Sequence, residues 1–447
     1  MRDIPLLLGF LIMTPMILTR PYLGVLAWCW TALLVPNSYV YGFASAIRFN
    51  LWIAVVTLLA WPFASKPKAI PLNTTSILLG GLLIWATISS VFSVAPVAAD
   101  TWSQWEQFVK TLVLSLAVMA FIRTRTRMVA ILFAVALSMG FHGILEAGKF
   151  VLTAGGHKIW GPGNSIIGDN NAFALAIIMT IPVLVYLYLQ FRNVLLRLML
   201  GGSIFLLVLT VIGTRSRGGF IGILVLGFWI FVTTRKKLTF IAVAFPLALL
   251  ALALAPDTWF DRMQTIEDVS QDSSFMGRVI AWKINTLAAI EHPLTGAGFH
   301  STQDLAVWKH LSENFSALDI VPTRRPDTVM AHAAHSIYFQ VLGDLGFVGL
   351  ALYLLLLAAA WRNASLAIKH SLANPEVRWA HDLARTFQYC LLPFIVSGAA
   401  LSMAYFDLAF VLVALTAVLR EETRVQAAMA ARSTVGMSTI ANRPAST

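Results

Sequence analysis

The sequence has 447 residues, of which 58% are hydrophobic and 12% are charged, and its 32 basic and 21 acidic residues give a net charge of +11. Soluble domains carry about 25% charged residues, so this composition excludes a water-soluble enzyme, a nucleic-acid-binding protein and a disordered chain. The positive charge does not indicate nucleic acid as a partner, because the cytoplasmic loops of membrane proteins collect lysine and arginine.

Apolar runs recur along the whole chain, and their lengths are typical of membrane helices. A backbone in lipid must satisfy its own hydrogen bonds, and these runs lack the alternation of a membrane barrel. The last run is long enough for two short spans that turn at residues 405–407, so the sequence predicts an all-α bundle of 12 or 13 membrane helices. The runs are residues 4–19, 22–36, 51–63, 76–94, 107–122, 128–146, 171–190, 198–214, 219–233, 238–255, 336–361 and 387–419.

Basic residues fall in every second connection between these runs, which predicts that those connections face the cytoplasm. The remaining connections then face outward. The N-terminus lies outside if all three of the first segments cross the membrane, and inside if one of them is only a half-span; the sequence leaves both open. The basic residues are Lys66, Lys68, Arg123, Arg125, Arg127, Arg192, Arg197, Arg235, Lys236, Lys237, Arg362 and Lys369.

The same pattern divides the chain into four parts. Residues 1–255 are predicted to be N-terminal membrane helices with short loops, and residues 256–335 a large outward loop. Residues 336–419 are predicted to be C-terminal membrane helices. Residues 420–447 are rich in alanine, serine and threonine and are expected to be a disordered cytoplasmic tail.

The first polar stretch is the outward loop 158–171, which reads KIWGPGNSIIGDNN and ends in Asp169, Asn170 and Asn171. These residues directly precede an apolar run, so they are candidates for a helix N-cap, where side-chain oxygens accept hydrogen bonds from free backbone N–H groups. A second interpretation, compatible with the first, is that they line a polar cavity for sugar hydroxyls.

The second polar stretch is the turn 213–219, which reads GTRSRGG. Arg215 and Arg217 lie on the outward side of the predicted topology, against the charge rule. A guanidinium keeps its charge and offers a fork of donors that suits phosphate oxygens, and the glycines let the backbone approach an anion. A phosphate site is one interpretation, and snorkelling to lipid headgroups is the other.

The third polar stretch is the large loop together with the start of the helix that follows it. Arg278 stands four residues before Trp282, the string EHPLTGAGF covers residues 291–299, and His332 and His335 come just before a membrane helix. A histidine at this boundary can be neutral near pH 7 and can accept a proton from a hydroxyl. A lone histidine there is more often structural.

Lys110 lies near the outward end of the run 107–122. An ionisable group at this depth is a candidate functional residue, and the alternative is that its side chain snorkels outward. The large loop has neither an HExxH motif nor a cysteine–histidine cluster, and Cys29 and Cys390 both lie inside apolar runs. No metal or cofactor is therefore expected.

In their order and spacing, these motifs resemble the O-antigen ligase and polymerase superfamily. The resemblance rests on the SRG turn at 216–218, on Arg278 with Trp282, on EHPLTGAGF and on AHSIYFQVLGDLGFVG from Ala334, and it is strongest over residues 158–349. The N-terminal MRDIPLLL and the loop KIWGPGNSIIGDNNAFALA are similar to the branch of O-glycosylation ligases found beside exosortase systems.

The resemblance implies a metal-independent glycosyltransferase of the GT-C type in the bacterial inner membrane, with its active site facing the periplasm. Such a protein moves a glycan from undecaprenyl diphosphate to an acceptor. The implied catalytic base is His335, and Ser336 and Asp344 stand where many members have Asn and Glu. The expected cations around the diphosphate are Arg217, Arg278, Arg215 and Lys110, and the expected contacts to glycan or acceptor are Asp169, Asn170, Asn171 and His332.

The leading expectation is an O-antigen ligase, which transfers the lipid-linked polysaccharide to lipid A–core among the membrane lipids. Two alternatives share this donor: an oligosaccharyltransferase that acts on protein hydroxyls, and a polymerase that extends the lipid-linked chain. A transporter of the same lipid-linked glycan is the alternative from another class, although no internal repeat supports it. The sequence does not identify the acceptor.

Overall fold

The structure is a computed structural model that describes residues 2–65, 69–163, 165–253, 273–318 and 323–441. Over these residues it is helical and contains no strand, so the predicted all-α fold is confirmed. Lys66 and Lys68, which were expected in a cytoplasmic connection, lie outside the described residues. The helices are α1 (Asp3–Thr19), α2 (Pro21–Leu34), α3 (Phe49–Ala60), α4 (Thr74–Val91), α5 (Ala98–Phe121), α6 (Arg125–Leu152), α7 (Asn170–Gln190), α8 (Val194–Gly213), α9 (Arg217–Thr233), α10 (Lys237–Ala253), α12 (Ser273–Glu291), α13 (Leu305–Glu313), α14 (Ile337–Ala373), α15 (Trp379–Ser397) and α16 (Asp407–Ala441).

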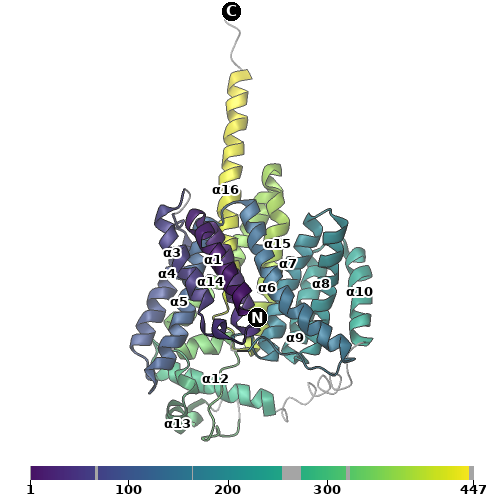
Figure 1. The fold of residues 1–447 in the computed structure, drawn as a ribbon. Helices are drawn as coiled ribbons and strands as arrows, with labels where there is room; N and C mark the ends of the chain where they lie inside the picture. Colours follow the sequence, from purple (N-terminus) through teal and green to yellow (C-terminus); the bar gives the residue numbers. More distant parts are fainter. Residues whose placement is uncertain (1, 66–68, 164, 254–272, 319–322, 442–447) are drawn as a thin grey trace, which may run out of the picture.

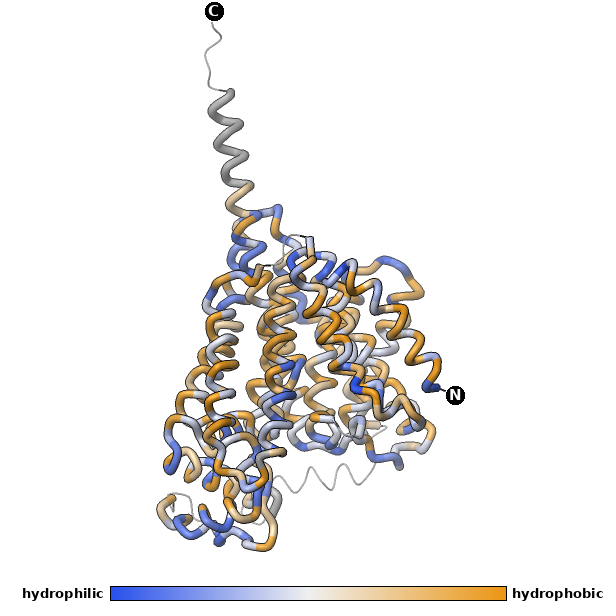
Figure 2. Tube along the Cα trace, turned by 60° about the vertical axis from the view of Figure 1, so that its left-hand side comes forward, coloured by the Kyte–Doolittle hydropathy of each residue, from blue (hydrophilic) through white to orange (hydrophobic). Residues whose placement is uncertain are grey.

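The helices form one bundle with two distinct ends. Helices α12 and α13 lie across one end, which we call the α12 end, while the C-terminal part of α16 projects beyond the other (Figure 1). Arginines gather at that other end, which we call the basic end: Arg125 donates to Gln190 Oε1 at 3.0 Å, and Arg127 lies 4.3 Å from the centre of the Tyr22 ring. Hydrophobic residues dominate the middle of the bundle, and hydrophilic residues concentrate towards its ends (Figure 2).

The composition of the helices is that of a multi-pass membrane protein. Within the described ranges, five helices are long and apolar enough to cross a membrane. Further apolar helices are shorter, and α2 has only 14 residues. Helix α7 lies at the centre, where it packs against α6, α8, α9 and α15 and is buried on nearly all sides. The five long helices are Thr74–Val91, Arg125–Leu152, Asn170–Gln190, Val194–Gly213 and Ile337–Ala373.

The N-terminus of α1 lies at the α12 end. Asp3 Oδ1 accepts hydrogen bonds of 3.0 Å from the backbone N–H groups of Gly42 and Ala44, in the connection between α2 and α3. In the same connection, Ser38 donates to the carbonyl of Gly163, in the loop before α7. Helices α1, α2 and α3 therefore each run from one end of the bundle to the other.

Helix α14 is longer than the predicted run 336–361 and is interrupted at Gly346, which has φ 68° and ψ −170°. The interruption exchanges helical hydrogen bonds for bonds to the loop after α12. The N–H of Phe347 donates to Pro293 O at 2.9 Å, and the carbonyl of Gly343 instead accepts from the N–H of Ala297 at 2.8 Å. Because the loop after α12 supplies partners for these backbone groups, it can pack directly on the broken helix.

The predicted division of the run 387–419 into two helices is confirmed, with α15 ending at Ser397 and α16 beginning at Asp407. Helix α16 continues over residues 420–441, within the segment that was expected to be a disordered tail. The sequence there is rich in alanine, the residue with the highest helix propensity, and α16 is already formed when it leaves the bundle. Residues 442–447 lie outside the described residues.

Candidate functional site

The loop before α7 and the turn between α8 and α9 are joined at the α12 end. The N–H of Ile159 donates to Gly213 O at 3.0 Å, and Asn170 Nδ2 donates to Thr214 O at 2.9 Å. The Ser216 hydroxyl donates to Asn171 Oδ1 at 2.7 Å. The first two polar stretches of the sequence are therefore one structural unit, although they lie more than 40 residues apart.

Asp169 forms the predicted N-cap of α7. Its Oδ1 accepts hydrogen bonds from the N–H groups of Asn171 at 2.8 Å and Ala172 at 3.1 Å. A carboxylate at this position also interacts favourably with the positive end of the helix dipole. These hydrogen bonds give structural roles to Asp169, Asn170 and Asn171. The bonds neither require nor exclude contact between these residues and a glycan.

The two arginines of the turn differ in their surroundings. Arg215 has a left-handed backbone, with φ 54°, and its Nη2 donates to the carbonyls of Gly155 at 3.1 Å and Gly156 at 3.2 Å. Arg217 is the first residue of α9, next to the N-cap Ser216, whose hydroxyl accepts from the N–H of Gly219 at 3.0 Å. Arg215 therefore fastens the loop before α7, while Arg217 stands at the positive N-terminus of a helix, a place that suits an anion.

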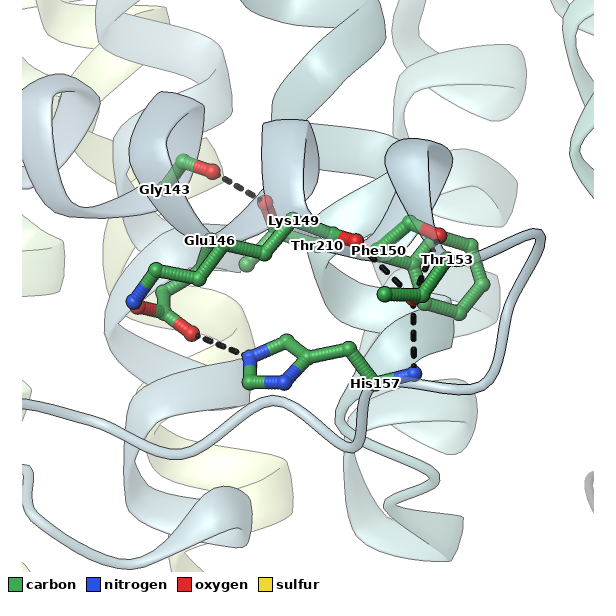
Figure 3. Close-up of polar contacts among 7 residues, drawn as sticks. All are labelled: Gly143, Glu146, Lys149, Phe150, Thr153, His157 and Thr210. Carbon is green, nitrogen blue, oxygen red and sulfur yellow. Dashed lines mark hydrogen bonds and ion pairs between the residues drawn. The ribbon is translucent and has the colours of Figure 1, made fainter.

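The beginning of the same loop is anchored to the end of α6 (Figure 3). His157 Nε2 lies 2.8 Å from Glu146 Oε2, and the His157 N–H donates to the Thr153 hydroxyl at 2.9 Å. Lys149 is the second partner of Glu146, at 2.5 Å. Together with the bonds from Arg215, these contacts fix the beginning of the loop, and the bonds of Asn170 and Asn171 fix its end.

His335 lies at the entrance to α14 and is held by its backbone. It has a left-handed φ of 46°, and its N–H donates to the Ser402 hydroxyl at 2.7 Å, in the connection between α15 and α16. Helix α12 packs on the first turns of α14, where the Trp282 ring stacks on Phe339 with 5.2 Å between centroids and 9° between planes. Arg278 lies one helical turn before Trp282, so the same packing carries Arg278 towards the start of α14.

Electrostatic interactions connect His335 with three other predicted site residues. Burial lowers the pKa of His335 most, and the positive charge of Arg278 and the neighbouring His332 lower it further. The Asp169 carboxylate acts in the opposite direction and raises the pKa. The net shift is downward, so the imidazole is neutral at pH 7 and can accept a proton.

Lys110 lies in a different part of this end, beside a cavity. Its Nζ is 3.2 Å from Glu106 Oε1, and the same carboxylate is 2.5 Å from Arg48. Lys110 lines a cavity of about 530 Å³ whose wall also includes Ala333 and Ser402, the neighbours of His335 in sequence and in space. The cavity therefore extends from Lys110 to the surroundings of His335. The charge of Lys110 is already paired with Glu106.

A buried group that was not predicted as part of the site joins three segments. Asp344 Oδ1 accepts from the N–H of His300 at 3.0 Å, and Oδ2 accepts from the Tyr405 hydroxyl at 2.9 Å. In the sequence, Asp344 is a carboxylate inside an apolar run, and this position marks it as a candidate functional residue. Nothing in the sequence links Asp344 to His300 or Tyr405. In the parts of the chain that the structure describes, no three His, Cys, Asp or Glu residues are grouped so that they could hold a metal ion.

Comparison with known families gives two matches. Residues 202–354 match the family described as O-Antigen ligase, and residues 1–191 match a family of unknown function (DUF5935). The first match includes Arg215, Arg217, Arg278 and His335, and it confirms the resemblance to the O-antigen ligase superfamily. No curated protein matches the chain.

Proposed function

We propose that this chain, which carries an O-antigen ligase domain, transfers a glycan from undecaprenyl diphosphate to lipid A–core on the periplasmic face of the bacterial inner membrane. The main observation in support is that Arg278, Asp169 and His332 all act on the pKa of one histidine, His335, at the entrance to α14. A neutral base beside an arginine suits a reaction in which a hydroxyl loses a proton and a phosphate gains charge.

In this reaction the acceptor hydroxyl gives its proton to His335 while its oxygen attacks the anomeric carbon of the first sugar. The bond between that carbon and the phosphate oxygen breaks, and undecaprenyl diphosphate leaves with the electron pair. A single displacement of this kind inverts the configuration at the anomeric carbon. A positioned base contributes roughly 10²–10⁴-fold to such a step.

Arg217 and Arg278 are proposed to bind the diphosphate, with Arg215 and Lys110 adding positive potential. Their charge interacts more strongly with the leaving diphosphate than with the intact donor, so it lowers the barrier as well as binding the substrate. Because Arg215 already donates hydrogen bonds to Gly155 and Gly156, its proposed role is to shape the loop beside the donor. With two guanidinium groups at the leaving oxygen, the scheme contains no step that requires a metal.

The direct test uses the purified full chain in liposomes with undecaprenyl-diphosphate glycan, rough lipopolysaccharide and EDTA. Wild type should give a glycan-extended lipopolysaccharide band, and His335→Ala should give none. The matched control is His310→Ala, an exposed histidine at the α12 end whose ring bonds to Glu291. Equal bands from wild type and His335→Ala would exclude His335 as the base.

The same assay separates the possible acceptors and the transporter. If wild type extends a peptide or another lipid-linked chain but not lipopolysaccharide, the donor site stands and lipid A–core is the wrong acceptor. If no acceptor is extended but labelled donor crosses the liposome membrane, the protein is a transporter. Product NMR decides the stereochemistry, and retention of configuration would rule out the single displacement.

A further inference from the structure

Two adjoining cavities open between the helices at the α12 end. The larger has a volume of about 530 Å³ and the smaller about 310 Å³. Gln104, His300 and Gln303 line both, so these three side chains form the boundary between the cavities. Both volumes fall in the range of small-molecule binding sites.

The wall of the larger cavity is unusually rich in carboxamide side chains. Polar residues inside a membrane helix bundle are costly and generally face a cavity or a substrate. A carboxamide has both donors and an acceptor, so one side chain can pair with a sugar hydroxyl in either role. The carboxamide residues are Asn37, Asn50, Gln104, Gln107, Gln303 and Gln340.

Three of these amides are occupied by the protein itself. Asn37 Nδ2 donates to the carbonyls of Ser45 and Ile47, Asn50 Nδ2 donates to the Thr31 hydroxyl, and Gln340 Oε1 accepts from the Ala404 N–H. In contrast, the side chains of Gln104, Gln107 and Gln303 make no hydrogen bond to any residue that the structure describes. Those three amides are therefore available to a ligand.

The charges around the cavities disfavour an acidic sugar. Among the described residues of the larger cavity, Lys110 is the cation, and Glu106 already pairs with it. The smaller cavity contains Asp100 and Asp304, and the larger contains Asp407. The carboxylates of Asp100 and Asp304 repel acidic sugars but tolerate neutral hydroxyls.

We infer that the two cavities bind consecutive uncharged sugar units of the glycan, with Gln104 and Gln303 hydrogen-bonding to the chain where it passes from one cavity to the other. The inference rests on the proposed function, because the glycan is the one carried by the donor. The larger cavity reaches Ala333 and Ser402, so the sugar bound there lies towards His335 and the smaller cavity takes a unit further along the chain.

Cysteine accessibility tests this site independently of transfer. Gln303→Cys introduces an exposed thiol, while the native Cys29 and Cys390 are fully buried. At a donor concentration ten times its Kd, undecaprenyl diphosphate carrying a neutral glycan should slow maleimide labelling about tenfold. Undecaprenyl diphosphate without sugar should leave the rate unchanged. Asn314→Cys, an exposed position at the same end outside both cavities, should be unaffected by either compound.

Equal labelling of Gln303→Cys by maleimide with and without the glycan would overturn the inference. A donor carrying uronic acid units should protect less than the neutral one, and equal protection would exclude the charge argument. If wild type transfers glycan but Gln303→Cys is not protected, the cavity assignment fails and the proposed function stands. If Gln303→Cys is protected but wild type transfers nothing, the cavity assignment stands and the proposed function fails.

A second variant covers the case in which the cysteine disturbs the fold. Gln104→Ala with Gln303→Ala should reduce kcat/KM about tenfold for a donor with several sugars, since each lost neutral hydrogen bond contributes about 0.5–1.5 kcal/mol. The same variant should lose less activity with a one-sugar donor, because that donor does not reach the smaller cavity. An equal loss with both donors would show a general defect and would contradict the assignment of the boundary residues.

Discussion

The Tyr405 hydroxyl donates a 2.9 Å hydrogen bond to Oδ2 of Asp344, and both residues are buried. The other carboxylate oxygen accepts from the His300 N–H. One side chain on α14 therefore holds the loop after α12 and the connection between α15 and α16 together. The same connection carries Ser402, the partner of the His335 N–H, so the position of the histidine depends on this group.

Tyr405→Phe should lower stability by about 1–3 kcal/mol, because a buried carboxylate oxygen loses its donor. Thermal unfolding in detergent measures the change, with Tyr41→Phe as the control, since Tyr41 is 85% exposed. An unchanged Tm for Tyr405→Phe would show that the bond contributes nothing to stability.

Arg278→Gln should move the acid limb of the pH profile of kcat/KM to higher pH. Arg278 lowers the pKa of His335, so removal of its charge raises that pKa, and the imidazole becomes protonated at a higher pH. Activity requires the neutral ring and is therefore lost earlier as the pH falls. If the acid limb of Arg278→Gln lies at the same pH as that of wild type, the titrating group is not His335, or Arg278 does not act on it.

Asp169→Asn should move the same limb to lower pH. Asp169 raises the pKa of His335, so its neutralisation lowers the pKa further. Asparagine is as good an N-cap as aspartate, so α7 should keep its start and its stability. The two substitutions are a matched pair, and shifts in the same direction would exclude an electrostatic origin.

Arg217→Ala should reduce kcat/KM for the donor by about 10–100-fold, the effect of losing a charge-assisted hydrogen bond of about 1.5–3 kcal/mol. Arg217→Lys should recover little, because lysine lacks the planar fork of donors. The control is Arg192→Ala, an exposed position in the connection between α7 and α8 at the basic end. Full activity in Arg217→Ala would remove this residue from the diphosphate site.

Gly346→Ala should destabilise the protein by roughly 1–3 kcal/mol or more, since φ is +68° and a Cβ would lie 2.4 Å from Leu294 O. Gly80→Ala on α4 is the control, because a Cβ there meets no atom within 4 Å and alanine favours the helix. Similar melting temperatures for both variants would contradict the close packing of the loop on α14.

The helices of the apolar runs were predictable because apolar runs and N-cap residues are local signals, whereas α12 and α13 lie within the predicted loop 256–335. Asp169 was predicted as an N-cap from its position alone, and it is one. The partners of Asn170 and Asn171 were not predictable, since Thr214 and Ser216 lie more than 40 residues further along the chain. The break at Gly346 also escaped prediction, because the apolar pattern continues through it and its cause is the contact with residues 293–297.

Candidate site residues could be named from the sequence by their type, but their arrangement could not. Basic residues against the charge rule identified Arg215 and Arg217, yet only the fold separates the first, bonded to Gly155 and Gly156, from the second. The carboxamides of the two cavities come from several helices and loops that are far apart in sequence. No spacing rule relates such residues, so their convergence becomes visible only in three dimensions.

The connection between α15 and α16 has a consequence for biogenesis. A nascent chain emerges from the ribosome N-terminus first, so the arginines and His335 are made before Ser402 and Tyr405, which hold the histidine backbone and Asp344. A chain that stops after α14 has every proposed catalytic group but lacks these two partners. Assembly of this end is completed only when nearly the whole polypeptide has been synthesised, so we expect the proposed transfer reaction only after the bundle has closed.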